Sequence, residues 1–457
     1  MIFSKDKSFY SELFKLALPI ALGSLVSFSV SLSDNMIISK LGGTAVSAVF
    51  LSNQIAFLLT MLSTGIESSV LSALSRLIGG GDCDKARAIA SLGIIFAIII
   101  SLLFFLPSSL FPKFVLSLLT DSKELVEKGA PYLRALGASF LFFAPSQAMA
   151  AALRSIKKAK IAFFASFSAF VVNLFFNLVL VFGKLGFPRL DIFGAGVATF
   201  FARAAEFSIL FVYVFFIDRE LKLRISAFLK INKSAFRLFL KTAAPLVSAQ
   251  LVWSVNNFFA SSLMGHNPKA LVAGLSCATA LYNLSYVVTA GISGALGIMV
   301  GRLVGENVKE NLPSLRSHFK SAQIISLFLG ALTALFMQSF KSAFVPLWGL
   351  SGISYEWANG FINVLSLLVI GTAYQLIALN GFVKSIGDVG FILKLESFSV
   401  FCLIIPLSLL ASSLGAPPLL IFALLKCDQI IKCPIAYFKL KKTFENRKSV
   451  FLRKARA

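Results

Sequence analysis

The chain has 457 residues, of which 57% are hydrophobic and 14% are charged, and its formal net charge is +23. Soluble domains carry about 45–50% apolar and about 25% charged residues, so this composition excludes an ordinary soluble protein and indicates a polytopic membrane protein. Excess basic charge is also typical of nucleic-acid-binding proteins, but its distribution, described below, explains it without nucleic acid.

Apolar runs recur along the whole chain. A helix that crosses a bilayer needs about 20 predominantly apolar residues, and open sheets cannot satisfy their backbone in lipid. We therefore predict an all-α integral membrane protein. The first run follows a basic start but lacks a small-residue cleavage site, so it is a helix rather than a signal peptide. The twelve predicted transmembrane helices are 13–39, 45–77, 88–111, 130–153, 161–183, 192–217, 238–264, 270–301, 318–344, 358–383, 391–413 and 416–438.

Cysteine and histidine are too few and too scattered for a metal or disulfide framework. The chain has five cysteines at irregular spacing and only two histidines, His266 and His318. We predict no disulfide, no metal site and no histidine-based acid–base cluster.

The basic residues are distributed unevenly between the two sides of the membrane. Twelve helices place both termini on one side, and about 31 of the Lys and Arg residues fall on that side against about 8 on the other. Cytoplasmic loops carry the excess of Lys and Arg. We therefore predict a multi-pass protein of the plasma (inner) membrane with both termini in the cytoplasm.

Segments of the first half recur in the second. Pro19 aligns with Pro245, and "SRLIGG" (75–80) with "GRLVGE" (301–306), both at an offset of 226 residues. A six-plus-six duplication follows, with lobes related by a pseudo-two-fold axis along the membrane normal and substrate between them. The predicted parts are a first six-helix lobe (1–217), a basic cytoplasmic linker (218–237), a second six-helix lobe (238–440) and a basic cytoplasmic tail (441–457).

Asp34 lies in the middle of the first apolar run. Ser24, Ser27, Ser31 and Asp34 share one helix face, and the matching stripe in the seventh helix includes Gln250 and Asn257, the partner of Asp34. An Asp at the centre of a membrane helix costs roughly 2.5–3.5 kcal/mol. Polar residues also join membrane helices, so the serines alone are explained by helix packing, whereas Asp34 predicts a function.

The Pro–Asp–Gly layout of the first helix resembles that of the MATE (multidrug and toxic compound extrusion) family of the MOP superfamily. "NLFFNLVLVFGKLGFPRLDIFGAGVAT" (173–199) is similar to its helix 5–loop–helix 6 pattern, and "RSIKKAK" and "KSIGDVG" resemble its loops after helices 4 and 10. The resemblance spans nearly the whole chain. It implies a transporter with two six-helix lobes that exports organic cations or other amphiphiles in exchange for H⁺ or Na⁺.

The resemblance also implies a cation-coupling site in the first lobe made by Asp34, Asn173, Asn177 and Thr199. Some members have Asp where this chain has Asn177, which leaves one negative charge fewer for sodium. Helices 7, 8 and 10 offer amides but no acid, so coupling is expected to rest on the first lobe. Burial disfavours the charge of Asp34, and protonation would remove the charge that a cationic substrate needs.

The expected substrate cavity contains further polar and aromatic residues, although packing explains any one aromatic equally well. Its candidates are Glu67, Gln250, Trp253, Asn257, Tyr282, Tyr286 and Tyr374. The aromatic side chains could provide cation–π contacts, and Glu67 lines the cavity or lies nearer the interface. Two further charged pairs, Arg203 with Glu206 and Asp428 with Lys432, are expected to be local ion pairs.

These features predict a secondary active antiporter of amphipathic or cationic compounds, not an enzyme. The "IGGGDCDKA" turn (78–86) lacks the Lys-Ser/Thr of a phosphate loop, and no nucleophile–base set occurs. We expect no cofactor beyond the coupling ion, no nucleotide and no nucleic acid, small molecules and the lipid bilayer as partners, and a monomer.

Three alternatives stay open. A lipid-linked oligosaccharide flippase of the same superfamily predicts about fourteen helices and a cavity rich in Arg or Lys, whereas Arg203 is the main central cation here. A membrane-embedded enzyme or scaffold predicts a buried acid–base set. A transporter of the major facilitator type predicts a Gly-Asp-Arg loop after helix 2, which "GGGDCDKAR" resembles only faintly.

Overall fold

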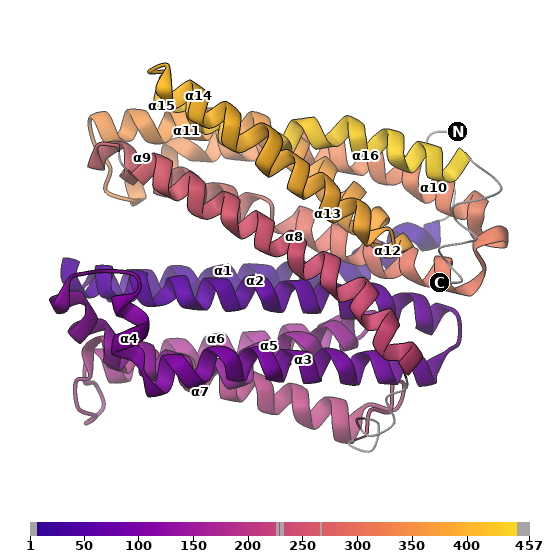
Figure 1. Ribbon diagram of the computed structural model, residues 1–457, viewed down its shortest axis with the longest axis horizontal. Helices are drawn as coiled ribbons and strands as arrows, with labels where there is room; N and C mark the ends of the chain where they lie inside the picture. Colours follow the sequence, from indigo (N-terminus) through magenta and orange to yellow (C-terminus); the bar gives the residue numbers. More distant parts are fainter. Residues whose placement is uncertain (1–6, 225–227, 229–232, 266, 446–457) are drawn as a thin grey trace. The chain divides into compact units, whose positions relative to one another are not determined.

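The computed structural model describes residues 7–224, 228, 233–265 and 267–445, and the regular elements in these ranges are helices (Figure 1). Parts of the predicted linker and most of the predicted tail lie outside the described residues. The first half contains α1 (Lys7–Ser39), α2 (Gly43–Gly79), α3 (Cys83–Leu110), α4 (Pro112–Ser117), α5 (Lys123–Ser155), α6 (Ala159–Phe176), η1 (Asn177–Val181), α7 (Asp191–Val212) and η2 (Tyr213–Ile217). The η elements are short π-helical turns.

The second half is also helical. It contains α8 (Lys233–Gly265), α9 (Lys269–Ser285), α10 (Val287–Leu347), α11 (Ile353–Gln375), η4 (Leu376–Val383), α12 (Lys384–Ile386), α13 (Val389–Phe398), η5 (Ser399–Ile404), α14 (Ile405–Ser413), α15 (Pro418–Leu425) and α16 (Asp428–Glu445). The long α10 is kinked at Asn307, whose backbone is extended (φ −158°, ψ 104°).

Eleven helices in the described ranges are long and apolar enough to cross a membrane. They correspond to the first eleven of the predicted segments, and the chain is therefore an all-α membrane protein, as the sequence predicts. Two predicted segments are interrupted. The segment 270–301 breaks at Tyr286, between α9 and α10, and 416–438 breaks at Lys426, between α15 and α16. The twelfth segment is thus two shorter helices.

The chain forms two compact units. One comprises residues 1–22, 75–81 and 248–457, and the other comprises 23–74 and 82–247. We call them unit 1 and unit 2. This division differs from the predicted lobe boundaries, because the start of α1 and the end of α2 contact the second half of the chain. The lobes 1–217 and 238–440 therefore stay a prediction about the repeat, whereas the units describe contacts.

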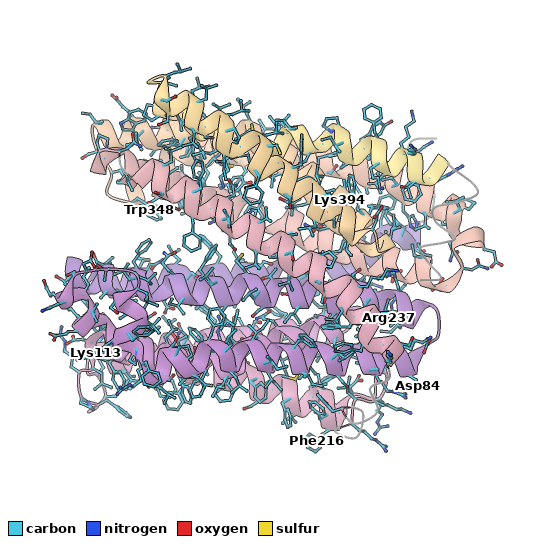
Figure 2. All side chains as sticks on the ribbon, in the orientation of Figure 1. Asp84, Lys113, Phe216, Arg237, Trp348 and Lys394 are labelled. Atoms are coloured by element: carbon cyan, nitrogen blue, oxygen red, sulfur yellow. The ribbon has the colours of Figure 1, made fainter. Side chains whose placement is uncertain are left out.

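Unit 2 is a bundle in which α5 packs against α3 and α7, and α7 packs against α6 (Figure 1). The approach of α5 and α7 is close because Gly196 has no side chain. A Cβ atom at Gly196 would lie 2.8 Å from the Cβ of Ala135 and 3.0 Å from the carbonyl oxygen of Tyr132. The labelled Asp84 and Lys113 mark opposite ends of α3 (Figure 2).

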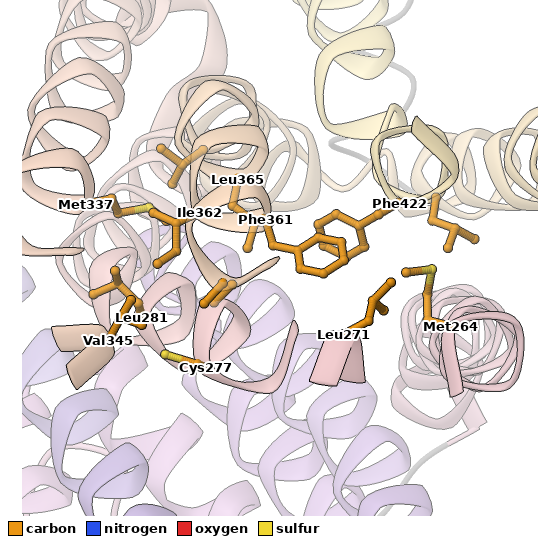
Figure 3. Packing of buried hydrophobic residues seen from close by; sticks show 14 of the residues in the cluster. Met264, Leu271, Cys277, Leu281, Met337, Val345, Phe361, Ile362, Leu365 and Phe422 are labelled. Atoms are coloured by element: carbon orange, nitrogen blue, oxygen red, sulfur yellow. The ribbon is translucent and has the colours of Figure 1, made fainter. Parts of the chain in front are cut away.

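Unit 1 has an apolar core between α9, α10, α11, α15 and neighbouring segments. The rings of Phe361 and Phe422 meet edge to face, with centroids 5.0 Å apart, and Leu271, Cys277 and Leu281 are fully buried beside them (Figure 3). Such dense packing of side chains fixes the positions of the helices that carry polar residues.

Glycines bring the end of α2 into backbone contact with α10 inside unit 1. A Cβ at Gly79 would collide with the carbonyl oxygen of Arg302, and one at Gly305 would collide with that of Arg76. At Gly80 the nearest atom would be the carbonyl oxygen of Gly305, at 3.0 Å. We call these residues the glycine contact. The two stretches are those that align as "SRLIGG" and "GRLVGE" in the sequence repeat.

Candidate functional site

Asp34 lies near the end of α1 and is held by an amide from another helix. The Nδ2 of Asn177 donates a hydrogen bond of 2.7 Å to the Oδ1 of Asp34. The hydroxyls of Ser27 and Ser31, on the same stripe, donate instead to carbonyls four residues earlier in α1. Asp34 is partly buried, and it is therefore the member of the stripe that reaches across to a neighbouring helix.

Asn173 and Asn177 form a buried amide pair one helical turn apart. Asn177 begins the π-helical turn η1, a kind of turn that often occurs at functional sites. Its Nδ2 also donates to the Oδ1 of Asn173, at 3.1 Å. The two residues are 0% and 1% exposed, yet the Oδ1 of Asn177 and the Nδ2 of Asn173 have no protein partner. Buried amide atoms are usually hydrogen-bonded, so this pair has capacity for a further ligand or a second arrangement.

A cavity of about 360 Å³ opens beside Asp34 within unit 2. Its walls come from α1, α2, α5, α6 and α7, and they combine polar groups with small apolar side chains. Side chains that line it include Asp34, Asn53, Thr60, Tyr132, Ser166, Asn173, Thr199, Arg203 and Glu206. The volume falls in the range of pockets that hold small organic ligands.

Thr199 and Arg203 lie four residues apart on α7 and both line the cavity. The hydroxyl of Thr199 donates to the carbonyl oxygen of Ala195, at 3.0 Å. The predicted pair of Arg203 and Glu206 is confirmed, with 2.8 Å between Nη1 and Oε2. Glu206 is the more buried member, and its other oxygen accepts a hydrogen bond of 2.7 Å from Ser166.

The structure brings Asp34, Asn173, Asn177 and Thr199 to one place, although Asn177 is not itself among the cavity-lining residues. Their role in coupling stays a prediction. Sequence reasoning missed the contribution of α2 and α5, where Tyr132 donates to the Oδ1 of Asn53 at 3.1 Å. The only signal in the sequence was an isolated Asn within an apolar run, which does not show which helix it faces.

The seven predicted substrate-cavity residues do not line the cavity beside Asp34. Glu67 has a partner that the sequence did not indicate: its Oε1 lies 3.0 Å from Nη2 of Arg154. The Nδ2 of Asn257 donates to the carbonyl of Trp253, on the same helix as Gln250. Local pairing therefore accounts for Glu67 and Asn257.

The three tyrosines belong to unit 1 and are engaged in packing and hydrogen bonds. The hydroxyl of Tyr282 lies 2.8 Å from that of Thr372, and its ring packs against Tyr286. The hydroxyl of Tyr374 accepts a hydrogen bond from Gln323, at 3.1 Å. These contacts favour the structural interpretation that the sequence left open for each aromatic residue.

Unit 1 contains a buried charged cluster that the sequence showed only in part. The Nζ of Lys432 lies 2.7 Å from a carboxylate oxygen of Asp428, as predicted, and also 2.7 Å from one of Glu396. Glu396 is on α13 and was missed, although it is a single acid inside an apolar run, the same signal that drew attention to Asp34. Second-half acids therefore exist, on helices other than those searched for them.

The long apolar helices, the polar cavity and the buried charges define a polytopic membrane transporter. The MatE family model matches residues 19–179 and 245–410, more than half of the chain. The protein belongs to the MatE family of transporters, and it is not an enzyme. The two matched ranges fall in the two halves of the sequence repeat.

Relatives and solved structures agree with this assignment. "Probable multidrug resistance protein NorM" of Thermotoga maritima is 24% identical over 301 residues, which are 66% of this chain and 64% of that protein. "FAD transporter" of Shewanella oneidensis is 25% identical over 366 residues, 77% of each chain. A variant of the Vibrio cholerae MATE transporter VcmN is 19% identical, with a TM-score of 0.86 over 97% of this chain and 99% of that one. The fold is thus that of the MATE transporters.

Proposed function

We propose that the protein is a secondary active antiporter that exports amphipathic organic compounds across the plasma membrane in exchange for protons, and that Asp34 carries the exchanged proton. The observation that supports this most directly is the placement of Asp34. It is a partly buried carboxylate beside a cavity of about 360 Å³, and its partner is neutral. Relatives named as multidrug resistance proteins support organic substrates.

Asp34 gives the cavity two states. When ionised, its carboxylate attracts a cationic group of a substrate in the cavity; when protonated, it does not. A proton and a cationic substrate therefore compete for the same group, and each favours release of the other. This competition is the thermodynamic requirement for exchange, because a ligand shifts an equilibrium only by its differential affinity for the two states.

The amide pair suits both states of Asp34. An ionised carboxylate only accepts hydrogen bonds, whereas a protonated one also donates. If the amides of Asn177 and Asn173 both turn by 180°, the Oδ1 of Asn177 faces Asp34 and accepts from its O–H, while Nδ2 of Asn173 donates to the same oxygen. Both orientations have the same shape, so neither needs new space. The unpaired Oδ1 of Asn177 and Nδ2 of Asn173 support this arrangement.

Protons are favoured over sodium as the coupling ion on the chemistry of the donor set. Asp34 is the one formal negative charge at the amide pair, and the Nδ2 of Asn177 already occupies its Oδ1. A sodium ion requires oxygen atoms on several sides, which here would have to come from Asn173, Asn177 and Thr199 after reorientation. We also propose that both termini are cytoplasmic and that the functional unit is a monomer.

The test is export driven by one gradient at a time. Purified protein in lipid vesicles is given either a proton gradient or a sodium gradient, and transport of a fluorescent amphipathic cation is followed. We expect the proton gradient alone to drive transport. Asp34→Asn should reduce proton-driven transport to the level of protein-free vesicles, because the side chain keeps its shape but cannot carry the proton.

Asp84→Asn is the matched control, because the side chain of Asp84 is 93% exposed and pairs with Arg87 at the start of α3. It should transport as the unaltered protein does. Transport that follows the sodium gradient, or a proton-driven rate that Asp34→Asn leaves unchanged, contradicts the proposal.

A further inference from the structure

Arg203 is a cation in a cavity that, under the proposed function, admits cationic substrates. A positive charge placed in a membrane protein near its substrate is costly, by roughly 2.5–3.5 kcal/mol on insertion scales. If the cavity accepted only simple cations, Arg203 would repel them. The contacts of its guanidinium group therefore bear on which substrates the cavity accepts.

The guanidinium group is held on two sides by protein. Its Nη1 donates to the Oε2 of Glu206 at 2.8 Å, and its Cζ lies 4.7 Å from the centre of the Phe143 ring. Glu206 is itself fixed, because the hydroxyl of Ser166 donates to its other oxygen. An arginine held in this way is oriented before a ligand arrives, and less side-chain freedom is lost on binding.

The exposed member of the pair is the cation. The side chain of Arg203 is 29% exposed, whereas that of Glu206 is 3% exposed. Glu206 therefore anchors Arg203 from the protein side, and Arg203 faces the cavity. A guanidinium group has five N–H donors, and within the described residues Arg203 makes one hydrogen bond, to Glu206. Donors remain for an acceptor in the cavity.

The cavity is thus lined by two groups of opposite sign. Asp34 is hydrogen-bonded only to an amide, and Arg203 is a fork-shaped donor that suits carboxylate or phosphate geometry. We propose that the cavity selects zwitterionic amphiphiles, whose basic group approaches Asp34 and whose carboxylate or other oxyanion is bound by Arg203. The inference rests on the proposed function, since it names the substrate class of the same cavity.

The test compares two probes that differ in one charge. Vesicles with the full chain are supplied with a fluorescent aryl compound carrying one amine and one carboxylate, and separately with its methyl ester. The measured quantity is the ratio of acid transport to ester transport under a proton gradient. We expect the unaltered protein to favour the acid.

Two variants should shift this ratio in opposite directions. Arg203→Gln combined with Glu206→Gln removes both charges as a neutral pair, and the ratio should fall about tenfold while the ester is still exported. Glu206→Gln alone leaves Arg203 without its counterion, and the ratio should rise. Arg203→Lys, which keeps the charge but loses the fork, should give an intermediate value.

The control variant is Arg189→Gln combined with Asp191→Asn, which removes an exposed pair (64% and 57% exposed) and should not change the ratio. Melting temperatures in detergent identify any variant that fails to fold. If the double variant at Arg203 and Glu206 is folded and keeps the ratio of the unaltered protein, the inference is wrong. If the unaltered protein transports neither compound under any gradient, the proposed function itself fails.

Discussion

At the scale of single residues, the site depends on a carboxylate whose partner is neutral. Asp34 meets the amide of Asn177, whereas most other acidic side chains in the described helices lie beside a base, as Glu67 lies beside Arg154 and Glu206 beside Arg203. A paired carboxylate is stabilised in its charged form. The acid without such a pair is therefore the one suited to exchange a proton during transport.

The buried cluster of unit 1 gives the first stability prediction. Lys432 is 1% exposed and serves both Glu396 and Asp428. Lys432→Met would leave two carboxylates close together without their cation, and removing one partner of a buried ion pair costs about 3–5 kcal/mol. We expect a markedly lower melting temperature in detergent.

The control for Lys432→Met replaces the whole cluster. Glu396→Gln, Asp428→Asn and Lys432→Met together remove all three charges, so stability should recover toward that of the unaltered protein. A melting temperature that Lys432→Met alone leaves unchanged would show that the cluster is not a stabilising unit.

How far residues could be predicted depends on the range of the interaction. The face shared by Asn173 and Asn177 follows from their spacing, and the pairs Arg203–Glu206 and Asp428–Lys432 follow from separations of three and four. Glu396 with Lys432, and Tyr132 with Asn53, join helices distant in the chain. Composition and periodicity carry no information on which helices are neighbours, so these contacts could not be predicted.

At the scale of elements, the long apolar runs fixed the helices but not their interruptions. The break at Lys426 falls within a predicted span, and Asp428 begins the helix that follows. Hydropathy averages over about 20 residues and cannot detect a change of backbone direction at one of them. The π-helical turn at Asn177 was equally invisible, although Asn177 itself was identified.

The glycine contact gives a prediction at this scale. Gly305→Ala would place a methyl group against the carbonyl oxygen of Arg76, a backbone atom that cannot turn aside. Overpacking of this kind costs about 1–3 kcal/mol or more. We expect a lower melting temperature and reduced transport, measured on the same preparation in detergent and in vesicles.

Gly390→Ala provides the matched control, because a Cβ atom at Gly390 in α13 would have no atom within 4 Å. Equal behaviour of the two variants would contradict the importance of the contact. The repeat in the sequence aligned "SRLIGG" with "GRLVGE" but gave no reason to expect that these stretches touch.

At the scale of the whole molecule, the proposed orientation can be tested with a natural cysteine. Cys83 is exposed at the start of α3, in the first loop predicted to be cytoplasmic. A membrane-impermeant maleimide should label Cys83 in inside-out vesicles and leave it unlabelled in intact cells. Labelling in intact cells would reverse the orientation inferred from the basic loops.

Lys184→Cys is the complementary probe. Lys184 is exposed in the turn between η1 and α7, on the opposite side of the predicted topology. In a background with Cys83→Ser, it should be labelled in intact cells. The two positions together report the side of each loop, independently of transport.

The fold class was predictable because it depends on averages over many residues, whereas the two units were not. Contacts assign residues 1–22 and 75–81 to unit 1, although they belong to the first repeat. Repeats in a sequence report ancestry, and contacts report where the chain packs in one arrangement. The particular residues that depart from the repeat boundaries are those at the start of α1 and at the glycine contact.

The glycine contact differs from the apolar core of unit 1 in what it would take to separate its two sides. In the core, rings such as those of Phe361 and Phe422 interlock and would have to change rotamer before the helices could part. At Gly79, Gly80 and Gly305 the backbones of α2 and α10 meet with no side chain of these residues between them. Such surfaces have little to disentangle at these positions, so the contact is both tight and easily reversible.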